Sequence, residues 1–474
     1  MTVMLSSVLL WIIPPLLLVM AILAAGHALL NKRDSRAAFG WIALCIILPL
    51  AGPIIYLIFG VNRVNSRARR VYITKLLKDS TDTIADPPGT RFRPLSTVGE
   101  RVVGKGLSSC DEVTILENGE GLYPPMLEAI NGAVKHVLLC SYIFDNDATG
   151  LQFVQALSAA SKRGVEVKVI LDGMGEMMSF PRIGRALRRE GVEFTRFNPI
   201  TLIPPSLNLN MRSHRKMLVI DNLYAFTGGA NIGSRHLCAL EGNRHPVQDI
   251  HFRLKGRMVD ELEWAFRRDW HYCLGTRKLG PFKHSNPNRA NAPVWSRLVL
   301  DGPNKELDRL NDLLLGVISA ASQRVWIMTP YFLPSLDLIG ALVAAHLRGV
   351  DVQILLPGDN NIKPAHWAAR NVLRTILEHD IAVYYQPPPF IHSKLLLIDD
   401  QYALIGSANL DPRSLRLNYE LGVELFSSEI NQQLSQYVSA KRTVSTRVTK
   451  AEIESRLLPE RIRDSIAWLF SPYL

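Results

Sequence analysis

The sequence has few cysteines and no tight cluster of metal-ligand residues. Its five cysteines are scattered along the chain and form no C-x-x-C pair. Such a set indicates neither a disulfide framework nor a zinc site, and most of these thiols are expected to be small core residues. Four histidines gather in one region without H-E-x-x-H or another tight ligand spacing: His236, His245, His251 and His271. The sequence therefore predicts no metal and no cofactor, with these histidines in the core or on the surface.

Charged residues are missing from two N-terminal stretches. Residues 1–31 and 37–62 contain no Asp, Glu, Lys or Arg. The apolar runs over 3–30 and 39–59 are long enough to cross a bilayer. They predict a transmembrane helical hairpin within residues 1–70. A cleaved signal peptide is the alternative for the first run, but its start is not basic and a second apolar run follows at once.

The flanks of these runs suggest an orientation. Pro14 and Pro15 lie within the first run, so a kink is expected there. Three basic residues separate the two runs, and a longer basic segment follows the second: Arg63, Arg67, Arg69, Arg70, Lys75 and Lys78. The positive-inside rule then favours a cytoplasmic catalytic part, with the N-terminus on the same side.

Basic residues outnumber acidic residues. The 474 residues include 54 Lys plus Arg against 43 Asp plus Glu, a formal net charge of +11. This balance suits an anionic partner, either a phospholipid surface or a nucleic acid. No stretch combines aromatic and basic residues for base stacking, so nothing favours nucleic acid. The length predicts two to three domains.

One eight-residue pattern, H-x-K-x-x-x-x-D, occurs twice. It covers His214, Lys216 and Asp221 in the first copy, and 392–399 in the second, which holds His392, Lys394 and Asp399. The four apolar residues before each Asp predict a buried strand. Residues two apart on a strand face the same side, so each His and Lys should point into one space. A Gly and an Asn follow each copy at matching distances: Gly228 and Asn231, then Gly406 and Asn409.

The repeat extends beyond the motif. Residues 156–173 align without gaps on 341–358, and 325–332 corresponds to 137–144. Strands alternate with helices in both copies, which predicts a duplicated α/β fold. In the first copy we expect helices over 121–136 and 153–163 and strands over 137–144 and 165–171. The expected order is a connector over 71–110, a first half over 111–280, a linker over 281–297 and a second half over 298–474.

Two His–Lys pairs brought face to face would make a phosphodiester site. One neutral imidazole attacks phosphorus while the other, protonated, donates its proton to the leaving oxygen. Lys216 and Lys394 would hold the phosphoryl oxygens, and Asn231 and Asn409 would donate further hydrogen bonds. A nucleophilic His needs an acceptor behind its other ring nitrogen, and Asp249 and Glu420 are the candidates. Asp221 and Asp399 complete the motifs and are expected to anchor them.

The paired motifs resemble the HKD signatures of the phospholipase D superfamily. The whole chain, including the N-terminal spans and residues 468–474, resembles the bacterial cardiolipin synthases. The resemblance implies transfer of a phosphatidyl group from one phosphatidylglycerol to another through a phosphatidyl–histidine, releasing glycerol. It implies an acidic residue behind the opposite His, with His214 as nucleophile and His392 as acid and base. It also implies a multi-pass protein of the bacterial inner membrane, with anionic phospholipids as partners and no nucleic acid.

The two copies differ at one position. Ser407 follows Gly406, and Gly229 stands at the equivalent place in the first copy. Ser407 could add a hydroxyl to the phosphate pocket, and Gly229 could not. Many members of the superfamily carry Ser at this position, so the first half departs mildly from the pattern.

Other functions fit parts of the sequence. A hydrolytic phospholipase D producing phosphatidic acid would use the same motifs, and a membrane-anchored nuclease would suit the positive charge. A scaffold without activity would require both motifs to be idle. The helix expected over 451–468 has charge on one side and fits packing on either the core or the membrane.

Overall fold

The computed structural model describes residues 2–32, 35–60, 92–202, 205–206, 210–276, 284–289 and 291–471. The chain forms two compact units, Met1–Arg70 and Val71–Leu474. The basic residues expected to set the membrane orientation after the second run lie outside the described residues, as do most of the expected connector and part of the expected linker.

The N-terminal unit is helical. Helix α1 (Thr2–Asn31) contains, over Ile13–Asn31, the one segment among the described residues that is long and apolar enough to cross a membrane. The second apolar run is divided into α2 (Ser35–Ile47), α3 (Ala51–Ile55) and the π-helix η1 (Tyr56–Gly60). The continuous helix expected over 39–59 is therefore absent from this described segment. The break precedes Pro49, which cannot continue the hydrogen-bond ladder of α2.

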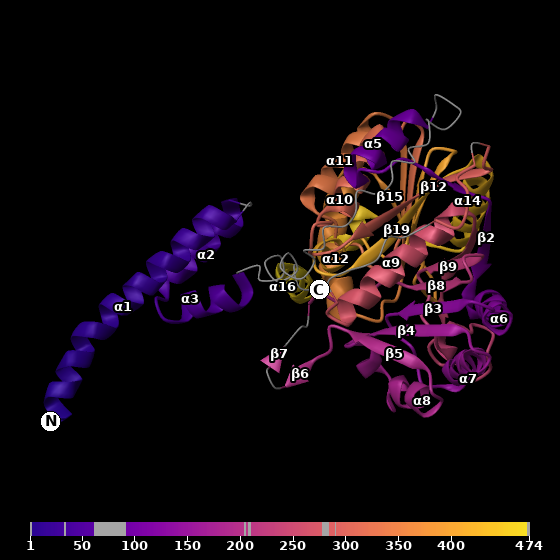
Figure 1. The fold of residues 1–474 in the computed structure, drawn as a ribbon. Helices are drawn as coiled ribbons and strands as arrows, with labels where there is room; N and C mark the ends of the chain where they lie inside the picture. The colour runs from indigo at the N-terminus through magenta and orange to yellow at the C-terminus, as the bar shows by residue number, and fades with distance from the viewer. Residues whose placement is uncertain are drawn as a thin grey trace. The chain divides into compact units, whose positions relative to one another are not determined.

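Two mixed sheets form the catalytic unit (Figure 1). Within the described residues, the first has seven strands in the order β2-β11-β9-β8-β3-β4-β5, and the second has nine in the order β1-β12-β19-β18-β17-β13-β14-β15-β20. The inner seven strands of the second sheet repeat the order of the first. The strands of the first sheet are β2 (Glu112–Glu117), β11 (Ile250–Lys255), β9 (Tyr224–Gly228), β8 (Met217–Ile220), β3 (His136–Ser141), β4 (Glu166–Asp172) and β5 (Glu193–Phe197). Those of the second are β1 (Ser108–Cys110), β12 (Val294–Asp301), β19 (Glu420–Phe426), β18 (Tyr402–Gly406), β17 (Leu395–Ile398), β13 (Arg324–Met328), β14 (Asp351–Pro357), β15 (Ala382–Gln386) and β20 (Thr446–Arg447).

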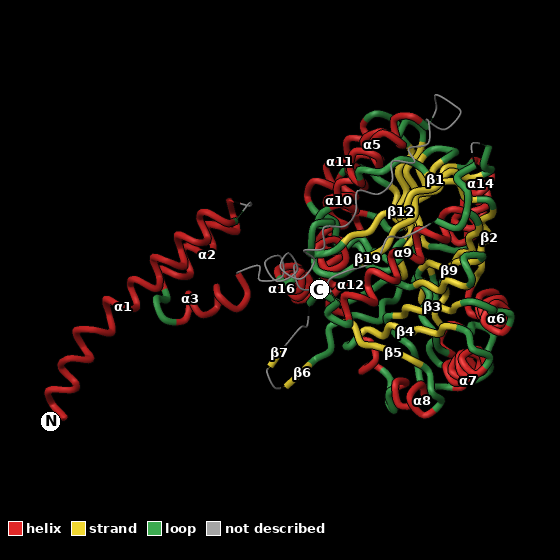
Figure 2. Tube along the Cα trace, viewed as in Figure 1, coloured by secondary structure: helices red, strands yellow, loops and turns green. Residues whose placement is uncertain are grey.

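Helices cover both sheets, and each half buries its own apolar core. Figure 2 shows the first-half helices outside the strands: α6 (Asn118–Asn131), α7 (Ala148–Lys162) and α8 (Ile183–Arg189). Helix α9 (Arg257–Cys273) contacts strands of both sheets and so lies between the halves. The second half adds α10 (Arg309–Ala320), α11 (Leu336–Leu347), α12 (Lys363–Glu378) and α14 (Ser428–Thr443).

The structure moves several expected boundaries. In the first copy the expected helices and strands are present as α6, β3, α7 and β4, with ends shifted by up to five residues. Part of the expected connector is integral to the second half: α5 (Arg93–Val103) packs on α10, and β1 pairs with β12. The apolar stripe of α5, which includes Leu95, explains this, because it joins the second core. The expected C-terminal helix is split into α15 (Lys450–Glu454) and α16 (Leu458–Leu469), with extended backbone at Leu457.

Candidate active site

The two motifs lie where the halves exchange backbone hydrogen bonds. Strand β10 (Val247–Gln248) of the first half pairs in parallel with β16 (Phe390–Ile391) of the second. The amide of His392 donates to the carbonyl of Gln248 at 2.7 Å. On the other side of the site, the amide of His214 donates to the carbonyl of Tyr419 at 2.9 Å. Each motif histidine is therefore fixed to the opposite half by its own backbone.

Each motif histidine side chain also contacts a carboxylate of the opposite half. His392 Nδ1 lies 2.8 Å from Asp249 Oδ2, a carboxylate of the first half. His214 Nδ1 lies 3.2 Å from Glu420 Oε2, a carboxylate of the second half, and 3.1 Å from the carbonyl oxygen of Ser407. Both carboxylates are buried. With Nδ1 facing the carboxylate, Nε2 of each ring is the nitrogen left for chemistry.

The two lysines take equivalent positions. Lys216 Nζ donates to the carbonyl of His214 at 2.8 Å, and Lys394 Nζ donates to the carbonyl of His392 at 2.6 Å. Lys394 Nζ also lies 3.1 Å from both ring nitrogens of His392. Burial lowers the pKa of Lys216 to about 8 and that of Lys394 to about 7. Two ammonium groups in one buried site prepare it for an anionic phosphodiester.

Burial also lowers the pKa of both motif histidines. It lowers the pKa of His214, against the opposing effect of Glu420. Burial lowers the pKa of His392 further, and the neighbouring ammonium of Lys394 adds to this effect. Both rings are therefore neutral in the empty site near pH 7. An incoming phosphate anion would favour the protonated form of one ring, because it adds negative charge beside it.

The motif aspartates lie at the other end of their strands. Asp221 accepts hydrogen bonds from the backbone amides of Val134, Lys135 and His136, at 2.7 to 2.8 Å. Asp399 accepts from the amides of residues 322–324, at 2.7 to 3.2 Å. Both backbones adopt positive φ at these aspartates. These contacts close the turn after each motif strand. Neither aspartate contacts the motif histidines His214 and His392.

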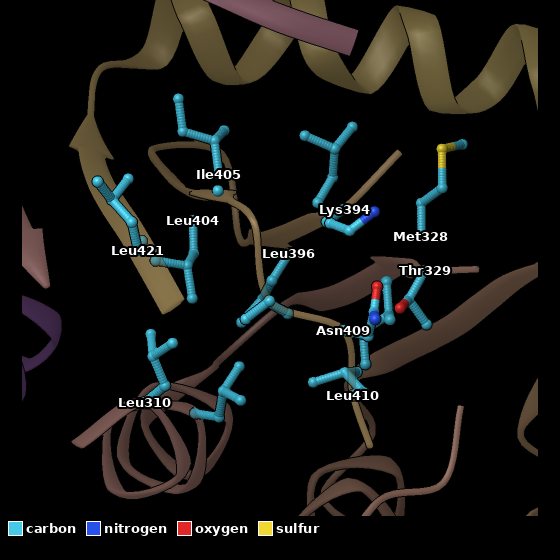
Figure 3. A pocket seen from close by; sticks show the side chains of 16 residues that line it. Leu310, Met328, Thr329, Lys394, Leu396, Leu404, Ile405, Asn409, Leu410 and Leu421 are labelled. Carbon is cyan, nitrogen blue, oxygen red and sulfur yellow. The ribbon is translucent and has the colours of Figure 1, made fainter. Parts of the chain in front are cut away.

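The two asparagines are buried beside the lysines but differ in their contacts. Asn231 Oδ1 accepts from the amide of Ile143 at 3.1 Å, so this oxygen is used within the first half. Among the described residues, no donor contacts Asn409 Oδ1. Figure 3 shows Asn409, Lys394 and Thr329 among the side chains around a pocket whose lining is mostly apolar. The volume of this pocket is about 40 Å³.

The sequence reasoning missed Tyr142 at the site and the buried partner of Arg215 behind it. The Tyr142 ring packs edge-on against the His214 ring, with centroids 4.8 Å apart, and Lys216 Nζ lies 5.6 Å from the Tyr142 centroid. Arg215 faces away from the site and binds both oxygens of buried Asp269 at 2.8 and 2.7 Å. The direction of Arg215 could have been predicted, because side chains alternate between the two faces of a strand. A residue between His214 and Lys216 must therefore face away from them.

Comparison with known proteins decides the family. The family described as "Cardiolipin synthase, PLD-like domain" matches residues 126–270 and 314–441. The chain belongs to this family. A second family, described as "Phospholipase_D-nuclease N-terminal", matches residues 19–60 of the N-terminal unit.

Curated cardiolipin synthases resemble the chain over nearly its full length. A cardiolipin synthase of Clostridium perfringens is 29% identical over 457 residues, covering 94% of this chain and 96% of the relative. The major cardiolipin synthase ClsA of Bacillus subtilis is 29% identical over 459 residues, covering 94% and 95%. The crystal structure of phosphatidylserine synthase from Haemophilus influenzae has a TM-score of 0.62 at 16% identity, covering 80% of this chain and 100% of that chain. This structure shows that the catalytic unit has the same fold.

The position that differs between the two motifs, Gly229 in one and Ser407 in the other, is matched to the carboxylate that each residue contacts. A Cβ at Gly229 would crowd the Asp249 carboxylate, so a side chain at this position would require Asp249 to move. In the other half, Ser407 Oγ donates to Glu420 Oε2 at 2.5 Å and accepts from the amide of Leu421 at 3.0 Å. Gly with Asp, and Ser with Glu, therefore form matched pairs. Ser407 contacts the carboxylate behind His214, and its expected contribution to the phosphate pocket stays a prediction.

Proposed function

We propose that this protein is a cardiolipin synthase that joins two phosphatidylglycerol molecules into cardiolipin and releases glycerol. The observation that carries the proposal is the crossed pair of histidine–carboxylate contacts, His392 with Asp249 and His214 with Glu420, flanked by two lysines. Family membership and the curated relatives support the same reaction.

In the first step, Nε2 of neutral His214 attacks phosphorus of one phosphatidylglycerol. The bond from phosphorus to the glycerol headgroup oxygen breaks, and protonated His392 gives this oxygen its proton. A phosphatidyl–His214 and free glycerol result, with His392 neutral. Lys216 and Lys394 stabilise the phosphoryl oxygens as their charge redistributes.

In the second step, neutral His392 removes the proton from a headgroup hydroxyl of a second phosphatidylglycerol. The hydroxyl oxygen attacks phosphorus, and the bond from phosphorus to His214 breaks. Cardiolipin leaves, His214 is neutral again and His392 holds the proton for the next cycle. A lipid hydroxyl would compete with water because donor and acceptor are held in the same bilayer.

The two carboxylates support this division of roles. Glu420 also accepts from Ser407 Oγ at 2.5 Å and from Asn418 Nδ2 at 3.3 Å, so its charge is shared among several donors. Asp249 lies closer to its histidine, at 2.8 Å. The shorter contact with Asp249 favours the protonated form of His392 and opposes the lowering of its pKa by burial and Lys394, and the shared charge of Glu420 suits a neutral nucleophile. Asp221 and Asp399 then serve as anchors of the motif strands.

The decisive experiment uses the purified full chain in mixed micelles of detergent and phosphatidylglycerol. Cardiolipin plus free glycerol, absent in His214→Ala and His392→Ala, is the expected result by mass spectrometry. Rapid quenching of the wild type during turnover should leave a phosphatidyl adduct on the peptide that contains His214, and His214→Ala should leave none. Phosphatidic acid as the sole lipid product would replace the synthase with a phospholipase D, and an adduct on residue 392 of the wild type would reverse the roles.

We also propose that the N-terminal unit is a multi-pass anchor with the catalytic unit on the cytoplasmic side of the bacterial inner membrane. The apolar segment Ile13–Asn31 and the apolar helices after it support the anchor. The sequence after residue 62 has more basic residues than the three between the two runs, which favours this orientation. Digestion of the catalytic unit by protease in inverted vesicles, and its protection in intact spheroplasts, is the expected result. The opposite pattern would place it outside.

A further inference from the structure

Helix α16 presents its apolar side to solvent. Leu458, Ile462, Ile466 and Leu469 are 67%, 51%, 52% and 66% exposed. Their spacing of four, four and three residues places them on one face of a helix. Trp468 and Phe470 are also exposed at its C-terminal end. An exposed contiguous apolar face of this kind marks an interaction surface.

The inward side of α16 is the charged one. Asp464 is buried, and it accepts from Arg463 Nε at 3.1 Å and from Arg463 Nη2 at 2.9 Å. Arg456 contacts the same carboxylate. The helix packs on α12 through this side, with Ala467 buried between them. A helix that only stabilised the core would have the reverse arrangement, with the apolar stripe inward.

A groove separates α16 from the start of α12. Pro364 and Trp367 form one wall, and Ile462 and Ile466 form the other, around a cavity of about 390 Å³. The guanidinium of Arg463 lies 4.5 Å from the Trp367 ring centroid. The outward apolar face therefore continues into an apolar groove that has one cation on its wall.

Contacts connect this groove with the catalytic site. The His392 and Phe390 rings have centroids 6.1 Å apart, and those of Phe390 and Tyr331 are 6.4 Å apart. The Tyr331 hydroxyl donates to Asn361 Oδ1 at 2.6 Å, two residues before α12 begins. These side chains link His392 to the segment that leads into α12, on which α16 packs.

We propose that the outward face of α16, defined by Leu458, Ile462, Ile466 and Leu469, docks on the surface of the phospholipid bilayer. The choice of a bilayer as the partner rests on the proposed function, because a phosphatidyl donor and acceptor both reside in a bilayer. Arg461 on the exposed flank complements anionic headgroups, whereas the charge of Arg463 is balanced by Asp464. Trp468 and Phe470 suit the boundary between headgroups and acyl chains. A bilayer with anionic headgroups matches the apolar face, Arg461 and the aromatic pair together, and a second protein copy is the alternative that the test below distinguishes.

The test places a fluorescent probe on α16 of the full chain in vesicles of phosphatidylcholine and phosphatidylglycerol. Ile466→Cys is labelled with nitrobenzoxadiazole, and the wild type, labelled identically, corrects for Cys238 and Cys273, which are half-buried. Val134→Cys is the matched control, because Val134 is 77% exposed and lies at the strand end that carries Asp221. We expect doxyl-lipid to quench the probe at 466 and aqueous iodide to quench the probe at 134.

Quenching of the probe at 466 by iodide, without quenching by doxyl-lipid, would overturn the proposal. Shielding from both quenchers would also overturn it and would assign the face to another protein surface. Quenching by lipid requires no turnover. If vesicles yield no cardiolipin but doxyl-lipid still quenches the probe, the proposed function fails and the docking surface stands.

An activity measurement provides a second test. Leu458→Ser with Leu469→Ser removes two exposed side chains that do not line the groove. We expect activity on vesicles to fall by roughly tenfold or more, and activity in detergent micelles to stay within about twofold. The control pair is Val134→Ser with Leu347→Ser, two equally exposed apolar residues, at 77% and 74%, away from α16. Equal activity of both pairs on vesicles would contradict docking.

Discussion

His392 Nδ1 lies 2.8 Å from Asp249 Oδ2, although the two residues belong to opposite halves of the catalytic unit. The contact joins positions 143 residues apart, and its counterpart between His214 and Glu420 joins positions 206 residues apart. Each half therefore supplies the carboxylate for the other half's histidine. Neither half should have activity alone.

Asp249→Asn should lower kcat by about 10²–10⁴-fold, because an amide cannot stabilise the imidazolium that His392 forms. The Asp249 side chain is buried, so unchanged thermal unfolding in detergent is the control for folding. Turnover is measured as glycerol release from phosphatidylglycerol micelles. A variant with nearly normal kcat would exclude Asp249 as the group that orients His392.

Ser407→Ala should raise the pKa of His214. It removes the hydroxyl that shares the charge of Glu420, so more of the carboxylate's charge acts on the imidazole. The acidic limb of kcat/KM, where His214 must be neutral, should move to higher pH. Ser393→Ala is the matched control, since Ser393 lies in the second motif and contacts the Tyr437 hydroxyl. Identical profiles for both variants would contradict this role.

Activity should fall as pH rises through 7 to 8. Burial lowers the pKa of Lys394 to about 7 and that of Lys216 to about 8, so both ammonium groups lose their charge in this range. Phosphate binding weakens as they become neutral. Lys394→Arg keeps its charge, so its alkaline limb should shift to higher pH even if kcat decreases. An unshifted limb in the pH profile of this variant would show that another group controls it.

Asp221→Asn should affect stability more than chemistry. The carboxylate accepts from three backbone amides, and its loss should cost roughly 2–4 kcal/mol. Burial opposes ionisation, but these amides outweigh it and lower the pKa of Asp221 below 3.8. A depressed folded-state pKa gives stability above the unfolded pKa that is lost as pH falls through the folded value. The difference in unfolding midpoint between variant and wild type should therefore be present at pH 7 and shrink below about pH 4. A large loss of kcat at an unchanged unfolding midpoint would instead make Asp221 catalytic.

Much of the architecture follows from local sequence. The repeat between 156–173 and 341–358 predicted the duplicated helices and strands, and these segments are present in both halves. The helical structure of the second apolar run was less predictable, because Pro49 and the close approach of Gly52 to Leu44 divide it. The expected connector over 71–110 was partly wrong for a different reason. Its helix α5 buries apolar residues in the core of the second half, and local sequence does not reveal that contact.

The sequence by itself determined the motif residues, the strands that carry them and the paired histidines and lysines, because these depend on spacing within a few residues. It also supplied both acidic candidates. Only the tertiary structure decided which carboxylate contacts which histidine, that Ser407 binds Glu420, and that α16 turns its apolar face to solvent. Those relationships join residues far apart in the chain, and their energies depend on burial, which local patterns do not specify.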